Sequence, residues 1–503
     1  MSAAPLLELR NRRAVPFSSV PNLPVPEFRD AVVQAVREGR RIVSLFGLPD
    51  GSATTRLVAV LAHDEAGALE AASTVVGEWY PALSPDCPAA ARFEREIAEQ
   101  CDVVPEGHTD LKPLRRHPPD HAPASRASRP HDRNAYVFDR IQGNEVHEVA
   151  VGPIHAGIIE PGHFRFQVYG ERVLGLEIML GYQHRGVERL LETAGAARAV
   201  LVAESIAGDT VIGHVDAYCG ALEALSRCRK TPRAQAIRGI ALELERLANH
   251  LGDLGAMAGD VAYQPAASYL GRMRGECLNL LMTLSGNRYG RGLVRPGGVT
   301  FDLAPAMADE MRARLARLSE ELLPVGRLML ENASVQARLE GVGVVKREDC
   351  RRLGLVGPAA RACEIPRDAR HDHPWGIFRF AHIPVATAWA GDALARALVR
   401  WLEIQRSLEF VTEQLGALPR GAPRVEPGDL KPDEMAVAMT EGWRGEIAHT
   451  VITDEAGRVR RHKVTDPSFH NWAAVSLAMP GQQISDFPLC NKSFNLSYAG
   501  HDL

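Results

Sequence analysis

The sequence has no apolar stretch long enough to cross a membrane. No uncharged apolar run approaches the roughly 18 to 20 residues that a spanning helix needs. The first 13 residues reach arginine without the apolar core of a signal peptide. We therefore expect a cytoplasmic chain that touches a membrane only through partners.

The chain also lacks an excess of one charge and any pair of closely spaced cysteines. Its 58 basic and 62 acidic residues leave a net charge of only -4, so nothing marks it as a nucleic-acid-binding protein. Of its eight cysteines, no two are spaced as Cys-x-x-Cys. This scatter argues against a zinc site, a sequence-local iron-sulfur site and a disulfide framework, and is typical of buried thiols. No Gly-x-Gly-x-x-Gly follows a predicted strand, so a dinucleotide-binding fold is not indicated.

The first part of the chain reads as a small α+β domain. With 503 residues, of which 46% are apolar, we expect two or three domains. Two β-type runs, 41–46 and 56–62, are separated by turn residues and predict a hairpin within a domain over residues 1–114. Residues 115–140 are rich in Pro, Arg and His and predict a solvated linker.

Helical periodicity dominates residues 141–503. From 235 to 257, apolar residues recur at alternating three- and four-residue steps, which places them on one helix face. Similar patterns cover 387–418 and 309–323, where we expect Pro324 to interrupt the helix. Short strands are predicted near 148–152, 164–169 and 446–464. The fold class is therefore α+β, with a large and mainly helical second domain.

Several motifs resemble one known family. Residues 93–114, which contain Gly107-His108, resemble the 30-kDa-type subunit of respiratory complex I. The later motifs include Val151-Gly-Pro-Ile-His155, Glu160-Pro-Gly-His-Phe-Arg165, Gly181-Tyr-Gln-His-Arg-Gly-Val-Glu188, Glu243-Leu-Glu-Arg-Leu-Ala-Asn-His-Leu-Gly-Asp253 and Gly290-Arg-Gly-Leu-Val-Arg-Pro-Gly-Gly298. In this order they resemble the large subunit of energy-converting nickel-iron hydrogenases of the formate-hydrogenlyase type and its complex I relative, the 49-kDa subunit. The resemblance covers nearly the whole chain and implies a hydrogenase-large-subunit-like fold for 141–503.

This resemblance implies four cysteine ligands for nickel, and the sequence lacks all of them. Aligned on the family's histidine, here His214, the first pair falls at Ala207 and Thr210. Counting on from residues 484–489 without a gap places the second pair at Ser497 and Gly500, and a register that differs by two residues would place it at Asn495 and Tyr498. Because a nickel-iron centre needs anionic, bridging sulfur ligands, we expect no metal in this chain and no hydrogen chemistry.

The complex I relatives also lack these cysteines, and the resemblance implies that the vacated cavity holds a quinone headgroup. The tyrosine that binds the quinone in those relatives falls on Gly208. The quinone histidine falls near Pro161, with His155 and His163 as candidate replacements. The quinone pattern is therefore incomplete, and quinone stays a candidate ligand.

The resemblance also implies roles in proton and charge transfer. Glu160 falls on a proton-relay carboxylate of the hydrogenases; alternatively it makes only local backbone hydrogen bonds. Arg444 matches an arginine that overhangs the metal, so its charge could hold an anion or a carboxylate such as Asp209; alternatively it braces a loop. The side chain of His214 could carry protons or pack as a hydrogen-bonded core residue, and the same holds for His155 and His163.

Other polar groups are expected to line the vacated cavity. Asp209 and Thr210 could bind water or a small ligand there, or Asp209 could cap a turn. Asp368 and Arg370 resemble a pair that lines the cavity, although a structural ion pair is the more common role of such residues.

These observations leave two main hypotheses open. In the first, the chain is a redox-complex subunit that passes electrons to a quinone or similar acceptor, coupled to ion transport. Its implied partners are a hydrogenase-like small subunit with an iron-sulfur cluster and antiporter-like membrane subunits, which would hold it at the inner face of the membrane. In the second, it is a non-catalytic scaffold in a complex I-like or carrier assembly. A mononuclear metal site on His, Asp and Thr is a third alternative.

Overall fold

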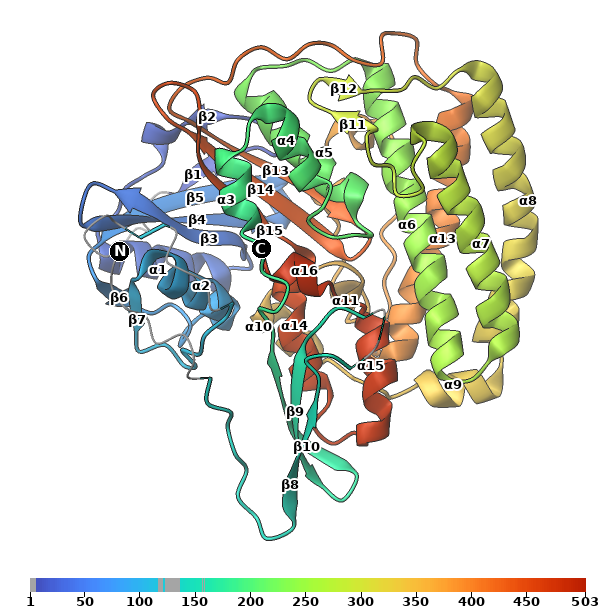
Figure 1. Cartoon of the computed structure of the whole chain (residues 1–503), viewed down its shortest axis with the longest axis horizontal. Helices are drawn as coiled ribbons and strands as arrows, with labels where there is room; N and C mark the ends of the chain where they lie inside the picture. The colour runs from blue at the N-terminus through green and yellow to red at the C-terminus, as the bar shows by residue number, and fades with distance from the viewer. Residues whose placement is uncertain (1–5, 116–120, 123–135, 156, 158) are drawn as a thin grey trace.

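The computed structural model describes residues 6–115, 121–122, 136–155, 157 and 159–503. Figure 1 shows a small N-terminal unit on one side, a bundle of long helices on the other, and strands between them. The predicted α+β fold class is confirmed.

The N-terminal unit is a four-stranded sheet with two helices. Its strands follow the order β1-β5-β4-β3 and are all antiparallel neighbours. The predicted hairpin is confirmed as β3 and β4, in which Phe46 pairs with Val58. The elements are β1 (Leu7–Leu9), β3 (Arg41–Asp50), β4 (Thr54–His63), β5 (Ala68–Val76), α1 (Val25–Arg37), α2 (Ala91–Cys101) and the parallel pair β6 (Trp79–Pro81) and β7 (Val104–Glu106).

Four long helices form the bundle: α6 (Pro232–Asp260), α7 (Gln264–Ser285), α8 (Pro305–Leu330) and α13 (Ala393–Gly416). Helix α6 begins after Thr231, whose hydroxyl accepts the Ala234 N–H at 3.1 Å, and Pro232 occupies the first turn. The expected interruption at Pro324 is wrong, because α8 continues through it to Leu330. A proline removes one helical hydrogen bond, and the neighbouring packing of α8 against α13 maintains the helix around that loss.

A second sheet joins the two halves of the molecule. Its strands follow the order β15-β14-β13-β2. They are β2 (Val15–Pro16), β13 (Glu434–Gly442), β14 (Gly445–Thr453) and β15 (Val459–Thr465). Strand β2 comes from the first 114 residues yet pairs with β13. Arg41 of β3 donates to the Glu446 carboxylate of β14 at 2.7 Å, and both side chains are buried. The N-terminal unit is therefore packed firmly against the rest of the chain.

A three-stranded arm extends below the body in Figure 1, in the order β10-β9-β8. Most of the predicted linker, residues 116–120 and 123–135, lies outside the described residues. Two described positions within it, Arg115 and His121, are buried rather than solvated. The arm strands are β8 (Val146–Val151), β9 (His163–Tyr169) and β10 (Arg172–Met179).

The remaining elements are short or close the chain. Helix α5 (Val211–Leu225) lies against β13 and β14, and the C-terminal helices lie near the centre of Figure 1. The others are α3 (Val187–Thr193), α4 (Ala196–Ala203), β11 (Val294–Arg295), β12 (Gly298–Val299), α9 (Ala333–Leu339), α10 (Arg347–Leu353), α11 (Gly357–Arg361), α12 (Ala369–Asp372), α14 (Pro467–Ala478), α15 (Phe487–Phe494) and α16 (Tyr498–His501).

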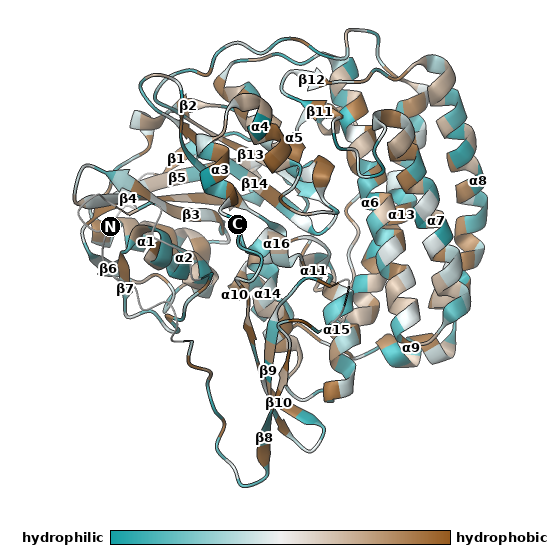
Figure 2. Cartoon of the chain, viewed as in Figure 1, coloured by the Kyte–Doolittle hydropathy of each residue, from teal (hydrophilic) through white to brown (hydrophobic). Residues whose placement is uncertain are grey.

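Figure 2 shows polar and apolar residues around each of the long helices, and none of the four is apolar along its whole length. Within the described part of the chain, no helix combines the length and the apolar character that crossing a bilayer requires. Seven of the eight cysteines are buried free thiols and Cys228 is half-buried, which agrees with the prediction of core thiols.

Candidate functional site

A tight hairpin places Arg444 in the region where the sequence predicted a site. Gly442 and Gly445 pair across β13 and β14, so Trp443 and Arg444 form the two-residue tip of the hairpin. The Arg444 guanidinium donates two hydrogen bonds to the Asp209 carboxylate, at 2.6 and 2.8 Å. It also lies over the Trp443 ring, 3.9 Å from the ring centre. The structure thus brings together two predicted site residues that are separated by 235 positions.

This ion pair lies at the edge of the site rather than deep inside it. The Arg444 side chain is 5% exposed and that of Asp209 is 35% exposed. Burial would raise the pKa of Asp209, but the Arg444 charge outweighs it and lowers the pKa below its usual value. Thr210 accepts a hydrogen bond from Arg444 at 3.0 Å and another from the Trp443 indole at 3.1 Å. The fixed positive charge of Arg444 therefore faces the partly exposed Asp209 side chain.

The four positions that correspond to the nickel ligands do not fit a nickel-iron centre. All are buried, and they carry Ala207, Thr210, Ser497 and Gly500. The Ser497 hydroxyl accepts the Gly500 N–H at 2.8 Å and so caps α16. A Cβ added at Gly500 would lie 2.5 Å from Cγ of Asp466, so the Asp466 carboxylate occupies the space that a ligand side chain at 500 would need.

The described residues give no support to another metal site. Among them, no three His, Cys, Asp or Glu side chains converge in a way that could hold a metal ion. Threonine is not among these side chains, so the mononuclear site on His, Asp and Thr stays an open alternative. At Gly208, where the complex I relatives carry tyrosine, an added Cβ would meet no atom within 4 Å, so the space is present without the phenol.

Glu160 makes local backbone hydrogen bonds, the predicted alternative to a proton-relay role. One carboxylate oxygen accepts the N–H groups of Tyr498 at 3.2 Å and Ala499 at 3.0 Å, at the start of α16. Both contacts are backbone hydrogen bonds that hold the C-terminal helix against the loop before β9. The proton-relay role for Glu160 stays a prediction.

The two candidate replacements for the quinone histidine lie in different surroundings. The His155 ring lies 6.3 Å from the Tyr498 ring, next to the C-terminal helix, and burial lowers its pKa. His163 instead contacts the Gly152 carbonyl at 3.3 Å and the Phe138 ring at 5.3 Å, on the side of the arm. The structure therefore brings His155, but not His163, to the edge of the site.

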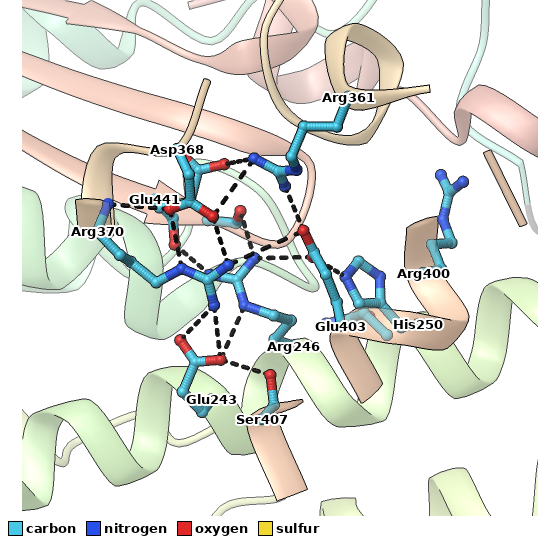
Figure 3. Close-up of polar contacts among 12 residues, drawn as sticks. Glu243, Arg246, His250, Arg361, Asp368, Arg370, Arg400, Glu403, Ser407 and Glu441 are labelled. Carbon is cyan, nitrogen blue, oxygen red and sulfur yellow. Dashed lines mark hydrogen bonds and ion pairs between the residues drawn. The ribbon is translucent and has the colours of Figure 1, made fainter. Parts of the chain in front are cut away.

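Asp368 belongs to a buried network of charges behind the hairpin (Figure 3). Arg370 donates to Asp368 at 2.6 and 2.9 Å and to Glu243 at 3.0 and 3.1 Å. Arg361 lies 2.8 Å from Glu441 and 2.7 Å from Glu403. Asp368 and Arg370 therefore form an ion pair within a larger network, and a ligand-binding role for Asp368 stays a prediction. The residues labelled in the figure are Glu243, Arg246, His250, Arg361, Asp368, Arg370, Arg400, Glu403, Ser407 and Glu441.

One face of α6 supplies much of this network, and sequence reasoning missed it. Glu243, Arg246, His250 and Asp253 recur at steps of three, four and three residues, which places them on one face of the helix. Nε2 of His250 donates to the ionised Glu403 carboxylate at 2.7 Å, and the His250 ring lies 6.2 Å from the Trp443 ring. A polar stripe one residue ahead of the apolar stripe, and so on an adjacent face of the helix, was the available signal, because a helix buried on both faces needs partners for its charged residues.

A second carboxylate of α6, Glu245, lies at the amino end of α5. Its oxygens accept the N–H groups of Ile212 at 2.7 Å and Gly213 at 3.1 Å. Burial raises the pKa of Glu245 to about 8; the two N–H groups oppose this rise and the Asp209 charge adds to it. Glu245 is therefore a protonated carboxyl at neutral pH, close to the ion pair of Asp209.

This protonation makes folding stability depend on pH. Because the folded state holds a proton that the unfolded state releases above its ordinary pKa of 4.5, stability falls as pH rises from about 4.5 through 8, by about 1 kcal/mol per pH unit. We expect Glu245→Gln to flatten this slope in denaturant unfolding measured from pH 5 to 8. The matched control is Glu243→Gln on the same helix. Arg246 and Arg370 outweigh burial and lower the pKa of Glu243, so that variant should keep the slope. Equal slopes in Glu245→Gln and the wild type would contradict this assignment.

Comparison with known proteins gives the family of this chain. The model of the 49-kDa subunit of respiratory-chain NADH dehydrogenase matches residues 260–433 and 423–502. The carbon monoxide-induced hydrogenase of Rhodospirillum rubrum is 31% identical over 351 residues, which are 69% of this chain and 96% of that protein. The chain belongs to the family that unites energy-converting hydrogenase subunits with the 49-kDa subunit of NADH dehydrogenase.

Two further relatives represent the two branches of this family. Formate hydrogenlyase subunit 5 of Escherichia coli is 29% identical over 438 residues, which are 84% of this chain and 77% of that protein. An NADH-quinone oxidoreductase subunit of Clostridium beijerinckii is 28% identical over 353 residues, which are 69% of this chain and 95% of that protein. The resemblance of the sequence motifs to this family is therefore confirmed.

Proposed function

We propose that the chain is the large subunit of a membrane-associated oxidoreductase complex and that it passes electrons to a quinone or a similar organic acceptor without hydrogen chemistry. The observation that supports this most concerns residue 500, the last of the four positions that correspond to nickel ligands. Gly500 leaves room for Asp466, a carboxylate, where a hydrogenase of this family would carry a thiolate. The names of the relatives, a formate hydrogenlyase and an NADH-quinone oxidoreductase, support the assignment to such a complex.

In this proposal the chain's own residues provide charge and protons. Arg444 offers a fixed positive charge that can hold an acceptor carrying partial negative charge after reduction. Asp466 and its hydrogen-bonded partner His214, 2.9 Å apart, can supply a proton at the same place. Electrons would arrive from an iron-sulfur cluster in a hydrogenase-like small subunit. Antiporter-like membrane subunits would hold the chain at the inner face of the membrane and couple these steps to ion transport.

The scaffold hypothesis remains the second candidate, and specific contacts favour it. Gly208 provides no phenol for a quinone, and Glu160 is engaged as a cap of α16. Under this hypothesis the buried network of Figure 3 keeps the family's shape for assembly alone. The small partner protein distinguishes the two hypotheses, because electrons reach this chain only if that partner carries a cluster.

The metal content of the native complex tests the proposal. We expect a complex purified through this chain from its native host to contain iron and acid-labile sulfide but no stoichiometric nickel. Elemental analysis and electron paramagnetic resonance measure both. About one nickel per chain would contradict the loss of the metal site. A cluster that is reoxidised by a quinone would support the redox function, and the absence of any cluster would support the scaffold.

A further inference from the structure

Three buried histidines form a line that ends at Asp466. They come from three different elements: His214 from α5, His449 from β14 and His462 from β15. Nε2 of His214 lies 2.9 Å from Oδ2 of Asp466, and Nδ1 of His214 lies 3.4 Å from Nε2 of His449. Nδ1 of His449 lies 2.9 Å from Nε2 of His462. All three imidazoles are fully buried.

If all three rings are neutral, the atoms in these contacts allow one consistent order of protons. With Asp466 ionised, His214 donates its Nε2–H to the carboxylate and accepts at Nδ1 from His449. His449 in turn accepts at Nδ1 from His462, so each ring carries its proton on Nε2. Burial would raise the pKa of Asp466, but the His214 hydrogen bond and the Arg444 charge lower it, which keeps the carboxylate ionised.

The surroundings keep the two strand histidines neutral. Burial lowers the pKa of His449 well below its usual value and that of His462 to about 4. Charges from several elements act on this pair: Glu188 and Glu192 of α3 favour the charged rings, whereas Arg12 and Arg461 disfavour them. The Tyr218 ring of α5 stacks on His462 with its centre 5.7 Å away.

The other end of the line lies beside a buried acidic group, Glu192, which contacts an exposed arginine. Nδ1 of His462 is buried and has no hydrogen-bond partner among the described residues. The backbone N–H of His462 donates to Glu192 at 3.0 Å. Glu192 also contacts Nε2 of His121 at 3.1 Å and the side chain of Arg189, which is 55% exposed, at 3.5 Å.

We propose that His462, His449 and His214 are a proton relay that carries protons from the region of Glu192 to Asp466. An unpartnered buried nitrogen at one end and an ionised carboxylate at the other give the line a direction. The proposal rests on the proposed function, since it is the reduced acceptor that would consume the protons. It assigns a task to two histidines that the family motifs in this sequence do not include.

Each transfer in the relay balances. A hydronium ion that reaches the unpartnered Nδ1 of His462 from the side of Glu192 gives up a proton and becomes water, and the Nε2–H bond of His462 breaks as the Nδ1–H bond of His449 forms. The same exchange moves a proton from Nε2 of His449 to Nδ1 of His214, and then from Nε2 of His214 to Asp466. One proton enters, one reaches the carboxylate, and no electron moves. Asp466 then gives its proton to the reduced acceptor, and a second proton can follow only after each ring has exchanged its Nδ1–H for an Nε2–H.

The tautomer order can be tested on the purified full chain, with or without redox activity. In nitrogen NMR of histidine-labelled protein, assigned with single His→Gln variants, we expect all three rings to be neutral at pH 7 with the proton on Nε2. A uniform shift of all three protons to Nδ1 would overturn the assigned order, because Nε2 of His214 would then have no proton for the ionised Asp466 carboxylate. A mixed order would overturn it, because two N–H groups or two lone pairs would then face each other.

Turnover of the native complex tests the transport of protons. We expect His449→Gln to lower turnover by roughly tenfold or more and to raise the solvent deuterium isotope effect, because glutamine cannot pass a proton between its two ends. The matched control is His373→Gln, which removes another buried histidine that contacts a carboxylate, Asp64, at 3.0 Å outside this line. That control should leave turnover and isotope effect unchanged.

The outcomes separate the relay from the proposed function. If the complex reduces an acceptor and His449→Gln matches the wild type in turnover and isotope effect, the relay is overturned while the redox function stands. If the complex reduces no acceptor, the proposed function fails, and the tautomer order alone decides whether the three rings form a relay.

Discussion

Replacing Arg361 by Met is expected to lower the free energy of unfolding by about 3 to 5 kcal/mol. Arg361 is fully buried and pairs with Glu403 at 2.7 Å, Glu441 at 2.8 Å and Asp368 at 3.6 Å. Methionine has a similar volume, so the packing changes little. The carboxylates, however, lose their shared cation and cannot reach water. Denaturant unfolding followed by circular dichroism measures the difference.

The matched control is an exposed pair of the same chemistry. Arg347 and Glu364 lie 2.9 Å apart, with side chains 47% and 59% exposed. We expect Arg347→Met to cost no more than about 1 kcal/mol, because solvent screens that pair. If both variants lost the same stability, the buried network would not be the source of the larger effect.

The proton balance of this network explains why the loss should be large. Burial, with the Asp368 charge, raises the pKa of Glu441, while Arg361 and the neighbouring arginines oppose the rise. Glu403 behaves in the opposite way: burial would raise its pKa, but Arg361 and His250 lower it far below the usual value. Arg361 therefore keeps Glu403 ionised and limits the rise of the Glu441 pKa. Its removal raises the pKa of both carboxyl groups.

The elements that the sequence predicted correctly are those with strong local patterns. Turn residues separate two β-type runs, 41–46 and 56–62. These runs form the hairpin of β3 and β4. The apolar stripe from 235 to 257 forms most of α6. Pro324 was misjudged, because a local rule cannot weigh the packing that holds α8 together on both sides of it.

The site was predictable only where the resemblance named residues. Arg444 and Asp209 were expected to meet, and they do. The histidine line was not expected, because it depends on the register of β14 and β15. His449 pairs with Val464 and Val451 pairs with His462, which makes the two histidines diagonal neighbours on one face. A shift of the register by one residue would move them to opposite faces, and a single sequence does not fix the register.

Replacing Arg444 by Gln is expected to lower the turnover of the native complex by roughly 100-fold, if the arginine stabilises a reduced, negatively charged acceptor. Glutamine keeps a polar group at the hairpin tip but removes the charge that faces the partly open side of the site. The measurement is acceptor reduction by the complex purified from its native host, with the content of this chain and of iron determined to show that assembly is intact.

Asp209→Asn decides whether that loss comes from the charge of Arg444 or from the broken ion pair. Both variants break the ion pair, but Asp209→Asn leaves the guanidinium charged and stacked on Trp443 and keeps one oxygen that can still accept an Arg444 N–H. An electrostatic role toward the acceptor predicts a much smaller loss of turnover in Asp209→Asn than in Arg444→Gln, because the positive charge persists. A role in bracing the loop predicts equal losses, since that loop is held by the pair and not by the charge alone. Equal turnover in both variants would therefore return Arg444 to a structural role and favour the scaffold over the redox subunit.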